Sequence, residues 1–337
     1  MIQRLDSRTT SPGDFQTQYV ARGLPVVLTH ALDSWDASTK WTLDFFRTVH
    51  GEQQVAVDHG AVSGNRWQRT TLAQYIDSFQ EHAEQAETGS AAHNPYLRTW
   101  HFADDLPELL DDFEALPHFP DMFQQLSPSL RPPFLWLFLC PAGAQTRLHV
   151  DIWHTDAWLA QIQGSKHFTL YHPSHRQYLE HGDQMADIHA PDPELFPDFG
   201  RAQPVEVILG PSEVLYIPRK WPHHAVSLQP SISLTGNFLS RSNRSAVLPL
   251  LAKYMQRRSM CERILGRPLR AGDSGRPTNL MAFCCHGGRI PADVALRLLK
   301  LGGTSADAPD ASESECSDDG DGDDQATHTE PAKSWRH

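Results

Sequence analysis

Between residues 131 and 241 the sequence is a succession of short apolar runs separated by glycine, proline and other turn residues. The runs are FLWLFLCPAG, LHVDIW, WLAQIQG, KHFTLYHP, PVEVILG, EVLYIP and HAVSLQPSISLTGNFLS. Strands that are this short and this closely spaced are typical of a sandwich or a closed barrel, and the jelly roll is one such architecture. The pattern therefore predicts an all-β core of the double-stranded β-helix type, with helical additions on either side.

Four regions follow from the rest of the chain. Residues 1–130 predict an N-terminal α/β cap and the start of the barrel, and within them residues 67–130 have a mainly helical pattern. Residues 131–241 are the predicted β-helix core. Residues 242–304 predict a helical region, in SAVLPLLAKYMQRRSMCERILG and PADVALRLLKLGG. Residues 305–337 have few aliphatic side chains and a dense acidic block, so we expect a disordered acidic tail.

Composition excludes some classes of function. The net charge is −12, and residues 301–337, with ten acidic and two basic side chains, hold most of it. This acidic balance makes nucleic acid an unlikely ligand and suits a basic partner better. The sequence has no apolar run of about 18 residues, so we expect no membrane span. Five cysteines without framework spacing, and a polar start without a signal peptide, predict a cytoplasmic or nuclear protein.

Two polar residues stand out in the predicted strand LHVDIW. Side chains two positions apart on a strand point to the same side, so His149 and Asp151 should face one way together. An imidazole beside a carboxylate supplies two thirds of the 2-His-1-carboxylate triad that holds non-haem Fe(II). A His-x-Asp pair by itself is more often structural than metal-binding, and another one, at His181 and Asp183, lies in a predicted loop.

Residues elsewhere in the predicted barrel support the metal hypothesis. The segment GPSEVLYIPRKWPHHAVSL contains two adjacent histidines, His223 and His224, and either is a candidate third ligand. Lys166 opens KHFTLY, where alternation places it on the same face as Phe168 and Leu170. A lysine rarely points into a core without a partner anion, so Lys166 predicts an anionic ligand inside the barrel.

These residues lie in segments that resemble a known family, the JmjC-domain, cupin-like Fe(II)- and 2-oxoglutarate-dependent oxygenases, in particular the protein hydroxylase branch. RPPFLWLFLCPAGAQTRLHVD, TDAWLAQIQGSKHFTLYHP and EVLYIPRKWPHHAVSL are similar to its consecutive core strands in order and spacing. PVVLTHALDSWDASTKWTLDFFRTVHG resembles its N-terminal segment. NPYLRTWHFADDLPELL resembles the region before the barrel in its lysyl-hydroxylase members. The resemblance covers about residues 5–245.

The resemblance implies a role for six residues. His149, Asp151 and His223 match the iron ligands, and His223 is preferred to His224 because the metal histidine of the family follows a step like Trp221-Pro222. Where this chain has Pro222, the family has a second tryptophan. The residues that match the 2-oxoglutarate site are Thr146, Lys166 and Asn237.

Two positions complicate this match. A regular pleat would turn Thr146 away from His149, so its assignment requires a bend between them. Leu159 stands where relatives place a second asparagine, so that contact is absent.

The resemblance implies an enzyme that uses Fe(II) and 2-oxoglutarate to hydroxylate a side chain of a protein, with lysine as the first expectation and a basic peptide as the expected partner. Alternatives keep the same cofactors but act on a small molecule, a tRNA base or methyl-lysine. An alternative of another class is a non-catalytic cupin-like binding module. The C-terminal helices could form a homodimer, since AVLPLLAKYM is amphipathic.

Overall fold

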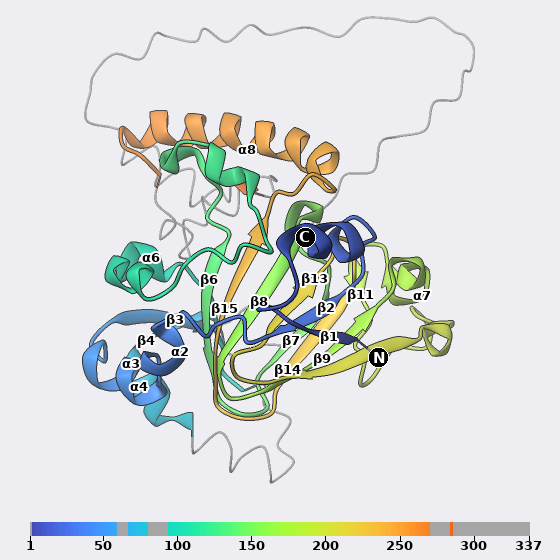
Figure 1. Cartoon of the computed structure of the whole chain (residues 1–337), viewed down its shortest axis with the longest axis horizontal. Coiled ribbons are helices and arrows are strands. Elements are labelled where there is room, and N and C mark those ends of the chain that lie inside the picture. Colours follow the sequence, from blue (N-terminus) through green and yellow to red (C-terminus); the bar gives the residue numbers. More distant parts are fainter. Residues whose placement is uncertain (1, 59–66, 80–93, 270–283, 286–337) are drawn as a thin grey trace, which may run out of the picture.

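A computed structural model describes residues 2–58, 67–79, 94–269 and 284–285. Two β-sheets form its centre (Figure 1). In order across the larger sheet, the strands are β1 Gln3–Asp6, β2 Val26–Thr29, β13 Val214–Ile217, β8 Asp156–Gln163, β15 Ser231–Phe238, β6 Leu135–Cys140 and β5 Leu97–Trp100. The smaller sheet consists of β12 Pro204–Leu209, β9 Lys166–Tyr171, β14 His223–Ser227 and β7 Gln145–His149.

The chain crosses between the two sheets as a jelly roll does. β6, β8, β13 and β15 belong to the larger sheet, and β7, β9, β12 and β14, which alternate with them along most of the sequence, belong to the smaller one. Apolar side chains of both sheets meet in one cluster, which includes Leu159, Leu215, Phe168, Leu170 and Val207. The predicted double-stranded β-helix with helical additions is confirmed. The last predicted run, HAVSLQPSISLTGNFLS, contains two strands, β14 and β15.

The N-terminal elements cover the outer face of the larger sheet. Their helices are α1 Pro12–Phe15, η1 Gln16–Val20, α2 Ala37–Lys40, α3 Leu43–Val49 and α4 Leu72–Asp77, and β3 Gln54–Asp58 pairs with β4 Trp67–Thr71. Side-chain caps begin several of these helices, as Thr42 does for α3 and Thr71 for α4. Phe15, Trp41 and Phe46 pack with Leu137 and Leu234 of the sheet in the largest apolar cluster.

The region 67–130 departs from its mainly helical expectation. Its described residues, 67–79 and 94–130, contain the strands β4 and β5 and only short helices: α4, α6 Phe102–Asp105, η2 Pro107–Asp112, η3 Met122–Gln125 and η4 Pro128–Leu130. Prolines at the first turn of η2 and η4 favour short, tight turns, and pairing with β6 makes β5 a strand. Tertiary pairing has overridden the local pattern here.

The segment LHVDIW is also different from its expectation. The strand β7 ends at His149, Asp151 lies outside it in extended backbone, and a tight 3-10 turn, η5 Ile152–His154, follows. Trp153 and His154 both adopt left-handed backbone with φ of 56°. The strand is therefore shorter than predicted, since it ends at His149 and leaves Asp151 in the segment beyond it.

Between β9 and β12 the chain forms a small excursion of η6 Pro173–His175, α7 Arg176–Leu179, β10 Glu180–His181, β11 Gln184–Met185 and η7 Phe199–Arg201. After β15, the 22-residue helix α8 Arg244–Leu265 lies beyond one end of the strands (Figure 1). Its Tyr254 packs on Trp153 at a ring distance of 5.5 Å. The predicted helix PADVALRLLKLGG and the acidic tail lie outside the described residues.

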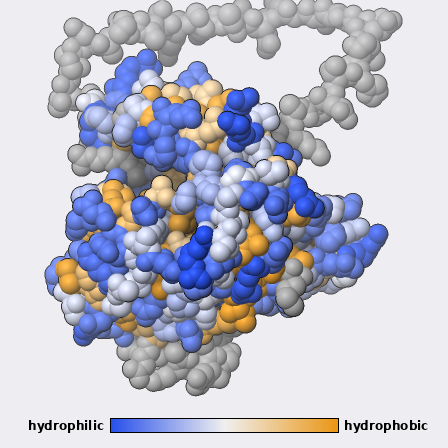
Figure 2. All heavy atoms as spheres, in the orientation of Figure 1, coloured by the Kyte–Doolittle hydropathy of each residue, from blue (hydrophilic) through white to orange (hydrophobic). Residues whose placement is uncertain are grey.

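The surface of the described residues gives no sign of a single apolar docking face. Large exposed apolar side chains lie on separate elements; they are Val49, Leu110, Ile208, Leu228 and Leu248. Figure 2 shows a mostly hydrophilic face on which apolar residues form scattered patches. None of the helices in the described ranges combines the length and the apolar character that crossing a bilayer requires. The homodimer through the C-terminal helices stays a prediction.

A buried carboxylate fastens β8 to the start of α8. Asp156 is 1% exposed and accepts hydrogen bonds from Ser240 (2.7 Å), Asn243 (3.0 Å) and the backbone N–H of Arg219 (2.9 Å). Tyr216 donates a further bond of 3.2 Å. Asp156 is distinct from the metal candidate Asp151. The hydrogen-bond donors that surround its carboxylate indicate a structural role.

We expect Asp156→Ala to lower the free energy of unfolding by about 2–4 kcal/mol, because it leaves several buried donors without an acceptor. Urea unfolding monitored by circular dichroism measures the change. Asp44→Ala is the matched control, since the Asp44 side chain is 81% exposed and its loss should change stability by less than about 0.5 kcal/mol. Equal effects of the two substitutions would contradict the structural role of Asp156.

Candidate active site

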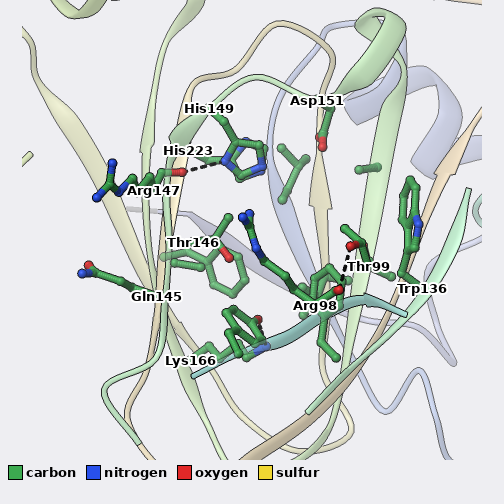
Figure 3. A pocket seen from close by; sticks show the side chains of 18 of the residues that line it. Arg98, Thr99, Trp136, Gln145, Thr146, Arg147, His149, Asp151, Lys166 and His223 are labelled. Atoms are coloured by element: carbon green, nitrogen blue, oxygen red, sulfur yellow. Dashed lines mark hydrogen bonds between the residues drawn. The ribbon is translucent and has the colours of Figure 1, made fainter. Parts of the chain in front are cut away.

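A cavity of about 580 Å³ lies between the two sheets. Its wall brings together all six residues that the sequence singled out: Thr146, His149, Asp151, Lys166, His223 and Asn237. Apolar side chains, among them Leu159 and Phe168, complete much of the lining. The jelly roll therefore gathers residues that are up to 91 positions apart in the sequence at one site (Figure 3).

Three of these side chains form a cluster at one end of the cavity. His149 ends β7, Asp151 lies two residues further along the chain, and His223 begins β14 directly opposite His149 in the strand register. One ligand atom from each residue lies within 4.8 Å of the other two, and the imidazole ring centres are 4.2 Å apart. Two imidazoles and one carboxylate at such distances can hold a divalent metal ion.

Hydrogen bonds orient both imidazoles for that task. Nδ1 of His149 lies 2.8 Å from the carbonyl oxygen of Arg147, and Nδ1 of His223 lies 3.0 Å from that of Trp221. A carbonyl oxygen only accepts, so each Nδ1 carries the proton and each Nε2 keeps its lone pair for a ligand. Burial is the main cause that lowers the pKa of His149 to about 3, which keeps that imidazole neutral.

The buried carboxylate of Asp151 is suited to bind a cation. Its Oδ2 atom is buried and has no hydrogen-bond partner among the described residues. Burial raises the pKa of Asp151, although His223 and Asn237 oppose that rise. A buried carboxylate oxygen without a donor is unfavourable unless a cation compensates it. The donor set and this unpaired oxygen fit a metal ion such as Fe(II).

Thr146 reaches the cavity because β7 contains the required bend. Opposite β7, His223 pairs with His149 but Ala225 pairs with Thr146, so one extra residue is inserted in β7 between these positions. A β-bulge of this kind shifts the side-chain alternation. Thr146 and His149 therefore both line the cavity, which a regular pleat would not permit.

The opposite end of the cavity holds a buried cation. Lys166 is 1% exposed, and its Nζ donates a 3.0 Å hydrogen bond to the hydroxyl of Tyr96. Among the described residues no carboxylate lies within ion-pair distance of this amine. Burial lowers the pKa of Lys166, because the charged form lacks a compensating anion. Phe168 and Leu170 of the same strand are also buried, as the alternation predicted.

Asn237 lies on β15 and lines the same cavity. It is 6% exposed, and its amide donates a 2.9 Å hydrogen bond to the hydroxyl of Thr155. Leu159 lines the same cavity with an apolar side chain, so the missing second asparagine leaves an apolar wall there. Trp153 is a core residue that packs on Phe134 at 4.9 Å.

Sequence reasoning missed Tyr96, Arg98 and Asp58, which also line the cavity. Tyr96 contacts Lys166. Burial raises the pKa of Tyr96, and a hydrogen bond between Tyr96 and Thr146 opposes that rise. Arg98 pairs with Asp58. The sequence signal for Tyr96 and Arg98 was their spacing of two positions in NPYLRTWHF, just before the barrel. Only the β5–β6 pairing, which the sequence does not report, places them at the site.

His224 should make the metal-free protein sensitive to acid. It is 3% exposed, and burial lowers its pKa to about 4 from the ordinary 6.5. Between these values the unfolded chain binds a proton that the folded chain does not, so stability should fall as pH falls through this window. We expect His224→Gln to reduce this loss by on the order of 2 kcal/mol. Urea unfolding across the window measures it.

His30→Gln is the control for this experiment, because the His30 side chain is 47% exposed. His149 contributes to the same loss, since its pKa is also lowered, and a residual pH dependence should remain in His224→Gln. Identical pH slopes for wild type and His224→Gln would refute the prediction.

Known proteins are similar in sequence to most of the described part of this chain. A family described as a cupin-like domain matches residues 12–244. The arginine-specific demethylase JMJ22 of Arabidopsis thaliana is 30% identical over 256 residues, 73% of this chain and 48% of that protein. The 2-oxoglutarate and iron-dependent oxygenase JMJD4 of Gallus gallus is 26% identical over 262 residues, 72% of this chain and 60% of that protein.

A further relative carries two activities in its name. The bifunctional arginine demethylase and lysyl-hydroxylase psr-1 of Caenorhabditis elegans is 24% identical over 270 residues, which are 75% of this chain and 64% of that protein. In each case the match spans less than two thirds of the relative's own length. The family match covers more than half of this chain and includes the whole β-helix, in agreement with the JmjC resemblance of its strands. The chain belongs to the cupin-like domain family, in its JmjC branch.

Proposed function

We propose that this protein is an Fe(II)- and 2-oxoglutarate-dependent oxygenase that acts on a side chain of a protein. One observation carries the proposal: the cavity has a cluster of metal-binding groups at one end and the unpaired cation of Lys166 at the other. A dicarboxylic 2-oxo acid matches both ends, since one end of it binds a metal and the other is an anion. The names of the relatives support the same cofactors.

In this proposal His149, Asp151 and His223 hold Fe(II), and Lys166, Tyr96 and Thr146 bind the distal carboxylate of 2-oxoglutarate. Iron held by these residues would supply, with 2-oxoglutarate and dioxygen, the chemistry for hydroxylating a C–H bond, with succinate and carbon dioxide as the products of 2-oxoglutarate. His149, Asp151 and His223 would supply three protein ligands, so a bound metal could also take up ligands that are not part of the protein.

The protein's own groups orient and protect that chemistry. The carbonyl groups of Arg147 and Trp221 fix the two imidazoles, so each would present its Nε2 atom to the metal in one orientation. Lys166 and Tyr96 hold the cosubstrate from its far end, and Asn237 flanks it from β15. The apolar wall of Leu159, Phe168 and their neighbours limits water in the cavity, which strengthens each of these charged contacts.

We take lysine as the first substrate side chain and methylated arginine as the second candidate. The lysyl-hydroxylase and arginine-demethylase names of relatives favour these two over small molecules or tRNA bases. The net charge of −12 suits a basic polypeptide. Hydroxylation of an N-methyl group leads to its loss as formaldehyde, so a single chemistry covers both candidates.

The test incubates the full chain with Fe(II), ascorbate, 2-oxoglutarate and basic peptide libraries that contain lysine or methylated arginine. We expect succinate in proportion to a product that has gained one oxygen atom or lost one methyl group, as mass spectrometry distinguishes. Asp151→Ala is the control. Succinate and product formation that persist in this variant would refute the proposal, as would a wild-type protein that binds neither metal nor 2-oxoglutarate.

A further inference from the structure

Strand β5 contains a bulge beside the cavity. Leu97 pairs with Leu139 and Trp100 pairs with Leu137, so β5 has one more residue than β6 between these two pairs. Thr99 accommodates the extra residue by adopting left-handed backbone with a φ of 57°. As a result Leu97 and Trp100 both face the main apolar core, and Arg98 and Thr99 line the cavity. A strained bulge that redirects a side chain is a common device next to active sites.

Asp58 holds Arg98 in this position. Asp58 is 4% exposed, and its backbone exchanges hydrogen bonds of 3.0 and 2.8 Å with that of Tyr96. Its carboxylate accepts a 2.8 Å bond from Nε of Arg98 and a second bond from Nη2. The guanidinium is therefore fixed by the same strand pairing that places Tyr96 against Lys166. Two charge-assisted bonds from one fork give Arg98 a defined direction.

That direction is toward the metal-binding end. In Figure 3 the Arg98 side chain extends from β5 toward His149 and His223, while Lys166 lies on its other side. Burial lowers the pKa of His149, and the charge of Arg98 adds to that lowering. Burial raises the pKa of Tyr96, and the charge of Arg98 opposes that rise. Arg98 thus stands beside the path from the metal-binding groups to Lys166, where the bound cosubstrate would lie.

We propose that Arg98 binds the carboxylate at the 2-oxo acid end of 2-oxoglutarate, and that Asp58 is the residue that positions it. This inference rests on the proposed function. The cosubstrate has two carboxylates, and the cavity then offers a fixed cation near each: Lys166 for the distal one and Arg98 for the one beside the metal. Because Asp58 neutralises Arg98 before the cosubstrate arrives, the guanidinium can stay in the cavity of the free protein without a net buried charge.

The test measures binding to the full chain loaded with Mn²⁺, a redox-inert substitute for Fe(II), by calorimetry. We expect Arg98→Gln to weaken 2-oxoglutarate roughly 10- to 100-fold, the effect of losing one or two charge-assisted hydrogen bonds, with unchanged Mn²⁺ affinity. Pyruvate, which lacks the distal carboxylate, should bind wild type weakly and lose a similar factor in Arg98→Gln. Lys166→Met should weaken 2-oxoglutarate and leave pyruvate unchanged.

Two further variants separate a specific contact from a general charge effect. Arg69→Gln removes an exposed arginine of β4 that does not line the cavity, and it should leave 2-oxoglutarate binding within about 2-fold of wild type. Asp58→Asn should weaken 2-oxoglutarate several-fold without affecting Mn²⁺, and Asp58→Glu should recover part of that loss. A purely structural role of Asp58 would change metal and cosubstrate binding together.

Three results would overturn the inference: 2-oxoglutarate affinity that is unchanged in Arg98→Gln, loss of Mn²⁺ in that variant, or pyruvate that fails to bind wild type or binds Arg98→Gln equally well. An Arg98→Gln protein that binds 2-oxoglutarate normally but peptide poorly would assign Arg98 to the substrate instead. A Mn²⁺-loaded wild type that does not bind 2-oxoglutarate would refute the proposed function itself.

Discussion

Replacing Asp151 by alanine should abolish metal binding and turnover together while the protein remains folded. The carboxylate is the only anion that the proposed triad offers, so its loss should lower the affinity for Fe(II) or Mn²⁺ by at least about 100-fold. Stability of the metal-free chain should not fall, because Oδ2 of Asp151 makes no hydrogen bond within the described residues. Calorimetric titration with Mn²⁺, succinate assays and urea unfolding measure the three quantities.

The adjacent histidines provide a matched pair for the same experiment. His223→Gln should lose the metal as Asp151→Ala does, whereas His224→Gln should keep it. The two residues are neighbours and both are buried, but His224 bonds to Gln145 at 3.1 Å and lies outside the cluster. Metal binding that survives in His223→Gln and fails in His224→Gln would move the site to the other histidine and contradict the geometry proposed here.

Lys166→Met should change stability and cosubstrate binding in opposite directions. In the free protein the amine is fully buried without an anion, so an apolar side chain of similar length should raise the free energy of unfolding by about 1–3 kcal/mol. The same substitution removes the partner of the distal carboxylate and should weaken 2-oxoglutarate by about 2–5 kcal/mol. Unfolding by urea and calorimetry with the Mn²⁺-loaded chain measure the two effects.

Lys166→Arg is the control for charge, since it keeps a cation and should retain part of the 2-oxoglutarate affinity. A structural lysine would give a different pattern: Lys166→Met would be less stable than wild type and would bind 2-oxoglutarate normally. Either of these two findings would argue against a cosubstrate site at this end of the cavity.

The β-helix core was predictable because its strands carry their own signals. Short β-branched and aromatic runs between turns mark five of the eight strands one by one, whereas the run LHVDIW overlaps β7 only at Leu148 and His149. Alternation correctly buried Lys166 with Phe168 and Leu170. The last run needed its Gln229-Pro230 turn to be recognised as the boundary between β14 and β15. Local pattern was sufficient here because each strand is built from neighbouring residues.

The detailed geometry of the site was less accessible from sequence. His149 is the last residue of β7 and Asp151 lies beyond it, so the two converge from a strand end and the segment after it, not from a continuous strand. The β7 bulge that brings Thr146 to the cavity was recognised only as a requirement. Asp58 and Arg98 meet because β3 contacts β5 and β5 pairs with β6, and no local periodicity reports such long-range pairing.

The central claim is that one metal ion and one dicarboxylic 2-oxo acid occupy the same cavity in contact with each other. Titration of 2-oxoglutarate into the full chain, once with bound Mn²⁺ and once metal-free, tests it most directly. We predict one 2-oxoglutarate per chain with Mn²⁺ and at least about 10-fold weaker binding without it, because the metal supplies part of the site. Equal affinity with and without the metal, or no binding in either state, would contradict the account.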